Sequence, residues 1–211
     1  MGENSKIEWT DSTWNPIRAR NLATGKVGWH CEHMSEACRF CYAEGINRRL
    51  GTGLDFKPGH RADIEIFLDE QMLLAPLRWK KPRRIFVNSM TDTFAEFVKD
   101  EWLDRMFAVM VLCPQHTFQV LTKRPERMRS YVIHLAVGGW PLKNIWLGVS
   151  AEDQATADER IPLLLQTPAA EPAEQTWHVL LKSDGTPNMV RPGKKRAGRL
   201  LDGIEHNGMP S

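Results

Sequence analysis

Three of the four cysteines follow one another closely, in the spacing Cys31-x6-Cys38-x2-Cys41. Thiolates are soft ligands that select zinc and iron–sulfur clusters. A closed structural zinc site needs four ligands, whereas a cubane cluster held by three cysteines leaves one iron open to a ligand that is not protein. His30 and His33 offer a fourth ligand for zinc. Three interpretations stay open: a cluster, a zinc ion, and unligated cysteines buried in the core.

The composition narrows the class of protein. The chain has 211 residues, of which 42% are hydrophobic, enough for one domain with a sizeable core. Clustered cysteines do not resemble a secreted disulfide framework, and neither a signal-peptide core nor a transmembrane run is visible, so a cytoplasmic protein is expected. The formal charge of +2 does not by itself imply nucleic-acid binding.

The elements that would position the cysteines alternate between strands and helices. Strands are expected at residues 6–10, 85–89, 118–122 and 144–150, with weaker ones at 63–67 and 177–181. Helices are expected at 42–50, from 69 with a break at Pro76, from 100 with Asp100 as cap, from 125 to the glycines at 138–139, and at 154–165. This alternation predicts an α/β fold with a parallel sheet of about four to five strands.

Polar residues follow several of these strands. Because ligands bind beyond the carboxyl ends of parallel strands, these residues and the cysteine loop are expected on one rim. The rim residues are Asn15, Asn88, Ser89, Asp92, Thr122, Lys123, Arg124, Ser150, Glu152 and Asp153. Lys123 and Arg124 suit a carboxylate or a phosphate. Structural roles compete with binding: Asx or Ser turns at Asn88–Asp92, and a helix cap from Ser150 onward.

Several motifs together resemble the phage-associated three-Cys-motif family, which is regarded as radical-SAM-like. They cover most of residues 6 to 166 and are Ile7-Glu8-Trp9-Thr10 with Thr13-Trp14-Asn15-Pro16, Cys38-Arg39-Phe40-Cys41-Tyr42-Ala43-Glu44, Ile85-Phe86-Val87-Asn88-Ser89-Met90-Thr91-Asp92, Gln119-Val120-Leu121-Thr122-Lys123-Arg124-Pro125 and Trp146-Leu147-Gly148-Val149-Ser150-Ala151-Glu152. The spacing of the cysteines suits this family, although C-x3-C-x2-C is more typical of radical-SAM enzymes at large.

The resemblance implies a partial (β/α) barrel with a [4Fe-4S] cluster on Cys31, Cys38 and Cys41. The open iron would take the amino and carboxylate groups of S-adenosylmethionine. One electron from a donor partner would cleave this cofactor to methionine and a 5′-deoxyadenosyl radical, which abstracts hydrogen from an unknown substrate. Its binding residues would be Tyr42 over the cluster or adenine, Asn88, Ser89 and Asp92 at the amino group or ribose, Lys123 at an anionic group, and Ser150 and Glu152 at the ribose.

The chain departs from the family after Leu165. Segments like Ser-Val-Glu-Pro and Gly-Gly-Glu-Ser are expected there, and neither is present, which indicates an internal deletion. We therefore divide the chain into a barrel domain at 1–166 and a linker with a mostly irregular tail at 167–211. Two alternatives to the radical enzyme follow: a zinc-stabilised binding module, and an inactive truncated homologue. The basic runs at 80–84 and 194–199 suit nucleic acid or a solvated face.

Overall fold

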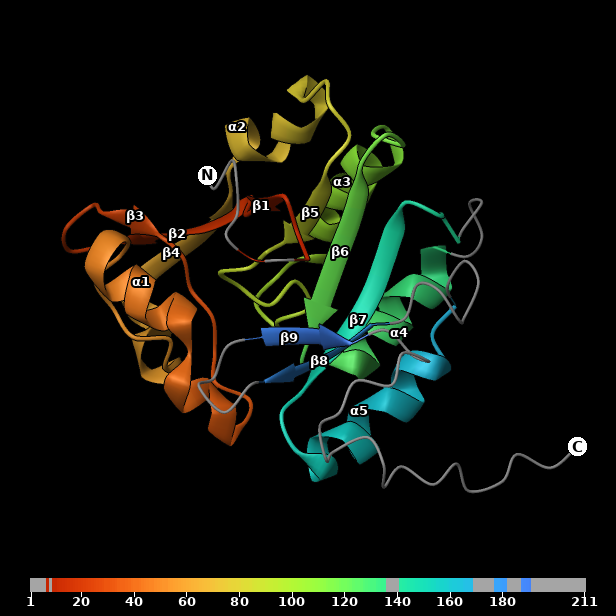
Figure 1. Cartoon of the computed structure of the whole chain (residues 1–211). Coiled ribbons are helices and arrows are strands. Elements are labelled where there is room, and N and C mark those ends of the chain that lie inside the picture. Colours follow the sequence, from red (N-terminus) through yellow and green to blue (C-terminus); the bar gives the residue numbers. More distant parts are fainter. Residues whose placement is uncertain (1–6, 8, 136–140, 169–176, 182–186, 191–211) are drawn as a thin grey trace, which may run out of the picture.

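A six-stranded sheet forms the centre of the protein, and helices cover one of its faces (Figure 1). The computed structural model describes residues 7, 9–135, 141–168, 177–181 and 187–190. The strands lie in the order β1 (Ser12–Trp14), β5 (Arg84–Val87), β6 (Thr117–Thr122), β7 (Ile145–Ala151), β8 (Trp177–Leu181) and β9 (Pro187–Val190). The first five are parallel, and β9 runs antiparallel to β8. The predicted α/β class with a parallel sheet is confirmed.

The two faces of the central strands have different partners. Ile85, Phe118 and Ile145 are neighbours in register and are buried in the main core. That core also contains apolar residues of α3 (Asp100–Val111), α4 (Pro125–Leu135) and α5 (Gln154–Leu165). Side chains point alternately to the two faces of a strand, so Phe86 and Leu121 lie on the opposite face, where they line a pocket. The helices thus support the sheet and leave its other face for a site.

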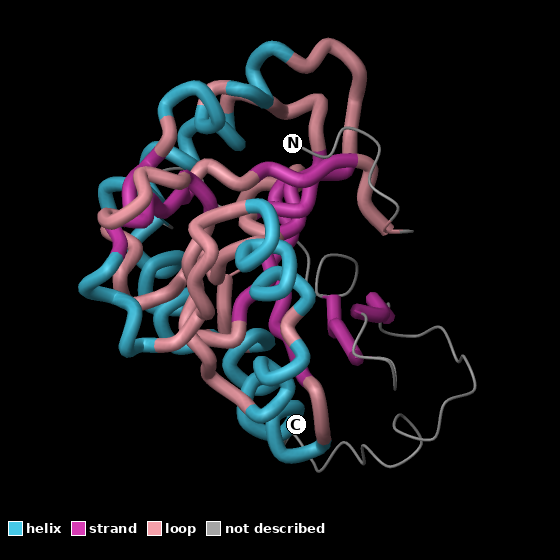
Figure 2. Tube along the Cα trace, turned by 90° about the vertical axis from the view of Figure 1, so that its left-hand side faces the viewer, coloured by secondary structure: helices cyan, strands magenta, loops and turns pink. Residues whose placement is uncertain are grey.

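A second, antiparallel sheet has the order β3 (Val27–Gly28), β2 (Ile17–Asn21) and β4 (Ile64–Leu68). The sequence predicted β4 but missed β2 and β3. This sheet and α1 (Tyr42–Leu50) lie at the left of Figure 1 and face the viewer in Figure 2. They carry the segment that contains the three cysteines, which runs between β3 and α1.

The first predicted strand is wrong in position. The residues that the structure describes within 6–10 form no strand, and β1 begins at Ser12, beyond the predicted range. Trp14 is fully buried and its Nε1–H donates to the carbonyl of Met72 over 2.7 Å. Trp9 instead packs against Phe86 in a tilted arrangement, with ring centroids 4.9 Å apart. Burial of Trp14 therefore decides which residues pair with β5, and local alternation does not.

Helix boundaries agree better with the sequence. α1 and α5 have the predicted bounds, with Pro162 inside α5. α3 begins at the expected place, but its cap is Lys99, and Asp100 is the first helical residue, where its charge favours the helix dipole. The helix expected from 69 stops early: α2 (Glu70–Leu73) is followed by a 3-10 turn at Ala75–Arg78, because Pro76 cannot donate a helical hydrogen bond.

The C-terminal part adds strands to the main sheet. β8 confirms the strand predicted at 177–181, and β9 was not predicted. The glycines at 138–139, the linker at 169–175 and most of the tail lie outside the described residues. No helix in the described ranges combines the length and the apolar character that a membrane crossing requires.

Candidate functional site

The cysteine loop begins at a tightly packed junction. A Cβ on Gly28 would lie 2.4 Å from the Thr52 nitrogen, so only glycine fits there. The buried Asn47 of α1 accepts hydrogen bonds from the backbone of Trp29 (2.9 Å) and Thr52 (3.1 Å), and donates to the carbonyl of Leu54 (2.9 Å). Asn47 thereby fixes the start of the loop against the end of α1.

The loop then crosses the carboxyl end of β5. The hydroxyl of Thr91 donates to the carbonyl of His30 over 2.9 Å. A 3-10 turn at Glu36–Phe40 contains Cys38, and Cys41 occupies the cap position of α1. The Tyr42 hydroxyl donates to the carbonyl of Ser89 over 2.8 Å. The first and last parts of the loop are therefore tied to the segment that follows β5.

All three loop cysteines line one pocket at this end of the sheet. Its volume is about 160 Å³, several times the ~30 Å³ that one water occupies in the liquid, so it has room for a small ligand. The pocket lining includes Cys31, Cys38, Cys41, Phe40, Tyr42, Phe86, Asn88, Ser89, Met90, Asp92, Leu121, Lys123, Arg124 and Ser150. Every residue predicted to hold the cluster or S-adenosylmethionine lines this pocket except Glu152. Of the other predicted rim residues, Thr122 and Arg124 line it, whereas Asn15 and Asp153 do not. The parallel strands bring the lining residues together, as predicted.

The three thiols lie in different electrostatic surroundings. Burial raises the pKa of Cys31 to about 12, and the carboxylate of Asp92 adds to that effect. Burial also raises the pKa of Cys41. At Cys38, burial is outweighed by the backbone amides of the preceding turn, chiefly Met34, and by the Lys123 ammonium, so its pKa lies below the ordinary value. Cys38 is thus the thiol most ready to ionise.

The cysteines are free thiols that lack a preformed single-ion site. None forms a disulfide. Within the described ranges, no group of three or more His, Cys, Asp or Glu side chains is arranged to hold a metal ion. His33 contacts Glu44 at 3.2 Å, and the buried His30 packs against Phe56. Neither histidine lines the pocket.

Asp92 organises the floor of the pocket. Its carboxylate accepts from the Thr122 hydroxyl (2.7 Å) and from the backbone of Lys123 (2.9 Å) and Phe94 (2.9 Å). The buried Arg124 guanidinium lies 3.2 Å from it. The hydrogen bond from the Phe94 backbone forms the Asx turn that was predicted as the structural role of Asp92. The remaining contacts join the ends of β5 and β6.

Asn88 has a strained backbone and an unused acceptor. Its φ is +51°, a conformation that asparagine tolerates better than most residues. The side-chain amide donates to the Thr93 hydroxyl (3.1 Å), while the buried Oδ1 has no hydrogen-bond partner. Next to it, the Ser89 hydroxyl donates to Asn15 Oδ1 over 3.2 Å, and Ser89 also lines the pocket. The Asn88 amide nitrogen also lies 3.9 Å from the Met106 sulfur, so this side chain packs toward the main core.

Glu152 stands behind the pocket and does not line it. Its carboxylate contacts Lys123 and lies 2.9 Å from Arg160, a buried residue that the sequence analysis did not single out. The signal was its place on the apolar side of α5, three residues after Ala157 and four before Leu164. The nearby Asp153 caps α5 through Thr156, which confirms the cap interpretation for this segment, with Asp153 rather than Ser150 as the cap.

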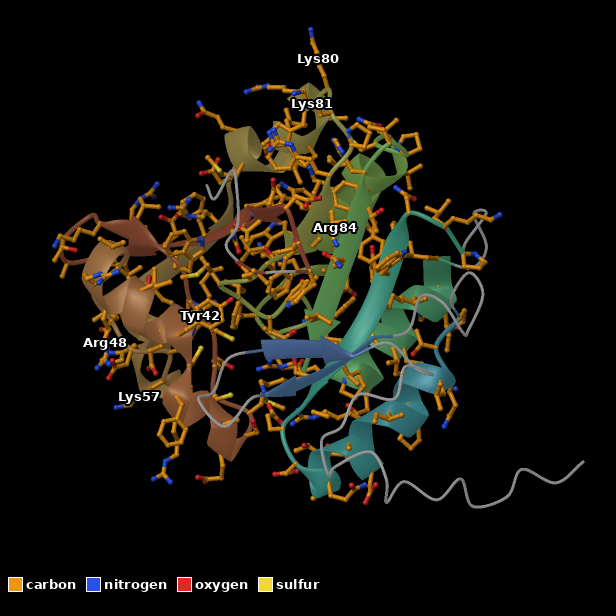
Figure 3. All side chains as sticks on the ribbon, in the orientation of Figure 1. Tyr42, Arg48, Lys57, Lys80, Lys81 and Arg84 are labelled. Atoms are coloured by element: carbon orange, nitrogen blue, oxygen red, sulfur yellow. The ribbon has the colours of Figure 1, made fainter. Side chains whose placement is uncertain are left out.

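The basic run at 80–84 lies away from the pocket. In Figure 3, Lys80 and Lys81 project at the top of the molecule, whereas Tyr42 lies well below them on the left. Arg84 pairs with Asp11 at 3.1 Å, and Arg83 lies over the ring of Trp79. The second basic run, at 194–199, lies outside the described residues.

Fold and pocket together define an α/β protein whose parallel sheet carries a three-cysteine pocket at its carboxyl end. The chain belongs to a family described as a protein of unknown function, DUF5131, whose pattern matches residues 4–173. No curated protein and no solved structure shows significant similarity to the chain.

Proposed function

We propose that this is an iron–sulfur protein related to radical S-adenosylmethionine enzymes, built on a partial (β/α) barrel. Cys31, Cys38 and Cys41 would hold a [4Fe-4S] cluster, and the pocket would hold S-adenosylmethionine. One observation carries the proposal: three free thiols line a single pocket at the carboxyl end of parallel strands. The resemblance of the motifs to the phage-associated three-Cys-motif family supplies the identity of the cofactors.

The donor set suits a cluster in its chemistry. Thiolate sulfurs ligate iron–sulfur clusters, and hydrogen bonds to sulfur tune them. The backbone N–H of Met34 lies 3.4 Å from the Cys38 sulfur, and the backbone of Asp92 donates to Cys31. A zinc ion would need four ligands each about 2.3 Å or less from the metal, and no such convergence exists in the described part of the chain.

The remaining pocket residues would bind and orient the cofactor. Asn88 lines the pocket, and its amide would accept a hydrogen bond from an amino group there. Lys123 would supply positive charge to an anionic group, and Phe86 and Leu121 give the pocket apolar surface. When bound, a cluster with one open iron supplies a low-potential electron to the ligand held there.

Anaerobic reconstitution with iron and sulfide tests the proposal. We expect about four irons per chain, a thiolate-to-iron absorbance band, and an EPR signal after reduction that changes when S-adenosylmethionine is added. Cys31→Ala, Cys38→Ala and Cys41→Ala should each lower the iron content strongly. Cys113→Ala is the matched control, because Cys113 is fully buried in the main core and should leave iron binding unchanged.

Other outcomes would overturn the proposal. One tightly bound zinc and no cluster would favour the zinc-stabilised binding module. Binding of neither metal, in a folded chain, would favour an inactive homologue that retains the motif. A cluster whose EPR signal ignores S-adenosylmethionine would support an iron–sulfur protein and refute the radical chemistry.

A further inference from the structure

We propose that Glu152 is a positioning residue that holds the middle of the cysteine loop and Lys123 against the pocket. The family resemblance implied that Glu152 contacts the ribose of S-adenosylmethionine. Its side chain instead contacts Ser35, Lys123 and Arg160. The identity of the ligand that the cysteine loop binds rests on the proposed function. The role of Glu152 in fixing the loop rests only on contacts within the protein.

Both carboxylate oxygens of Glu152 are engaged. Oε1 accepts from the Ser35 hydroxyl at 3.0 Å and contacts the Lys123 ammonium. Oε2 accepts from Arg160 at 2.9 Å, and the same Arg160 nitrogen donates to the carbonyl of Ser150 at 2.6 Å. The side chains of Glu152 and Arg160 are 6% and 4% exposed. A buried carboxylate with this many partners has one orientation.

Ser35 connects this carboxylate to a proposed cluster ligand. It lies three residues before Cys38, its carbonyl accepts from the Cys38 backbone at 3.0 Å, and its hydroxyl is 3.8 Å from the Cys38 sulfur. Within the described part of the chain, the Ser35–Glu152 hydrogen bond connects residues 34–40 to a segment distant in sequence. The ends of the loop are tied to α1 and to the segment after β5, so only this bond ties its middle to the end of β7.

The charges explain why a carboxylate is needed here. Lys123 and Arg160 are both largely buried, with side chains 22% and 4% exposed. Without Glu152 the two cations would face each other in a medium of low dielectric, where charges interact strongly. With Glu152 in place, the Lys123 ammonium is paired with a carboxylate and stays at the pocket that Cys38 also lines.

Hydrogen exchange on the metal-free protein tests the inference without reference to any cluster. The variants are Ser35→Ala, which removes one hydroxyl, and Glu152→Gln, which removes the charge. Glu159→Gln is the matched control, because Glu159 is exposed and adjacent to Arg160 on α5. A hydrogen bond to a charged group predicts about tenfold or greater acceleration of exchange in peptides covering 34–41. Peptides from β6 and the control variant should match the wild type.

Rescue and metal release separate positioning from general stability. Ser35→Thr keeps the hydroxyl and should restore slow exchange. In reconstituted protein, Ser35→Ala should lose iron to a chelator several-fold faster than the wild type or Glu159→Gln. Unchanged exchange at 34–41 in both Ser35→Ala and Glu152→Gln would overturn the inference, even in a protein that binds a cluster. Accelerated exchange in a protein that binds no iron would support the positioning role and refute the proposed function.

Discussion

Replacement of Gly28 by alanine should destabilise the protein and disrupt the junction at which the cysteine loop begins. The added Cβ would lie 2.4 Å from the Thr52 nitrogen, 2.5 Å from Asn47 Oδ1 and 2.5 Å from the Gly51 Cα. Two of these atoms belong to the backbone, so no side-chain rotation relieves the contact. The chain must separate β3 from the end of α1.

The loss in free energy of unfolding can be worked out from the overpacking at Gly28 and the hydrogen bonds that break there. Overpacking of a buried site costs about 1 to 3 kcal/mol. The Asn47 bonds to the backbone of Trp29 and Thr52 lie at the same junction, and each buried group left unpaired costs about 1 to 3 kcal/mol. With one of these bonds lost, we expect the free energy of unfolding to fall by about 2 to 6 kcal/mol. With an m-value of about 2 kcal/mol per molar urea, the midpoint moves by about 1 to 3 M.

Urea unfolding followed by tryptophan fluorescence measures this shift, and Gly45→Ala is the matched control. A Cβ at Gly45 meets nothing within 4 Å, and the residue lies inside α1. Alanine there should stabilise the protein by about 0.5 to 1 kcal/mol. A Gly28→Ala midpoint within about 0.25 M of the wild type, equivalent to less than 0.5 kcal/mol at that m-value, would refute the close approach of β3 to α1.

Two other substitutions probe the charges around the sheet. Asp92→Ala leaves the buried Arg124 without its carboxylate partner and removes the hydrogen bond from Thr122. The free energy of unfolding in urea should therefore fall by about 3 to 5 kcal/mol, and a fall of less than about 1 kcal/mol would contradict this. Hydrogen bonds from Arg84 hold the pKa of Asp11 below its usual value, so the pair stabilises above about pH 4 and the stabilisation disappears as the pH falls through the lowered pKa. Asp11→Asn should therefore cost about 0.5 kcal/mol at pH 7, a small amount because the pair is exposed to solvent, and nothing at pH 2; an equal difference at both values would show that the charge is not responsible.

Most helices and core strands could be predicted because their signals are local. The bounds of α1 and α5 were predicted from apolar periodicity and breakers, and β6 and β7 from short apolar runs. β1 could not be placed in this way, because the choice between 6–10 and 12–14 depends on whether Trp14 fits the core beneath Met72. The β2 and β3 strands were not predicted for a similar reason, because their pairing is set by contacts with β4, far along the chain.

The candidate site divides in the same manner. The sequence alone determined most of the side chains that gather at the pocket, because parallel strands place the residues that follow them on one edge. Only the tertiary structure decided what each residue does there: Asp92 joins two strand ends, Asn88 keeps an unpaired acceptor, and Glu152 turns away toward Arg160. A side chain's role depends on partners distant in sequence, and Ser35 and Glu152, separated by 117 positions, meet only after the sheet and helices have packed.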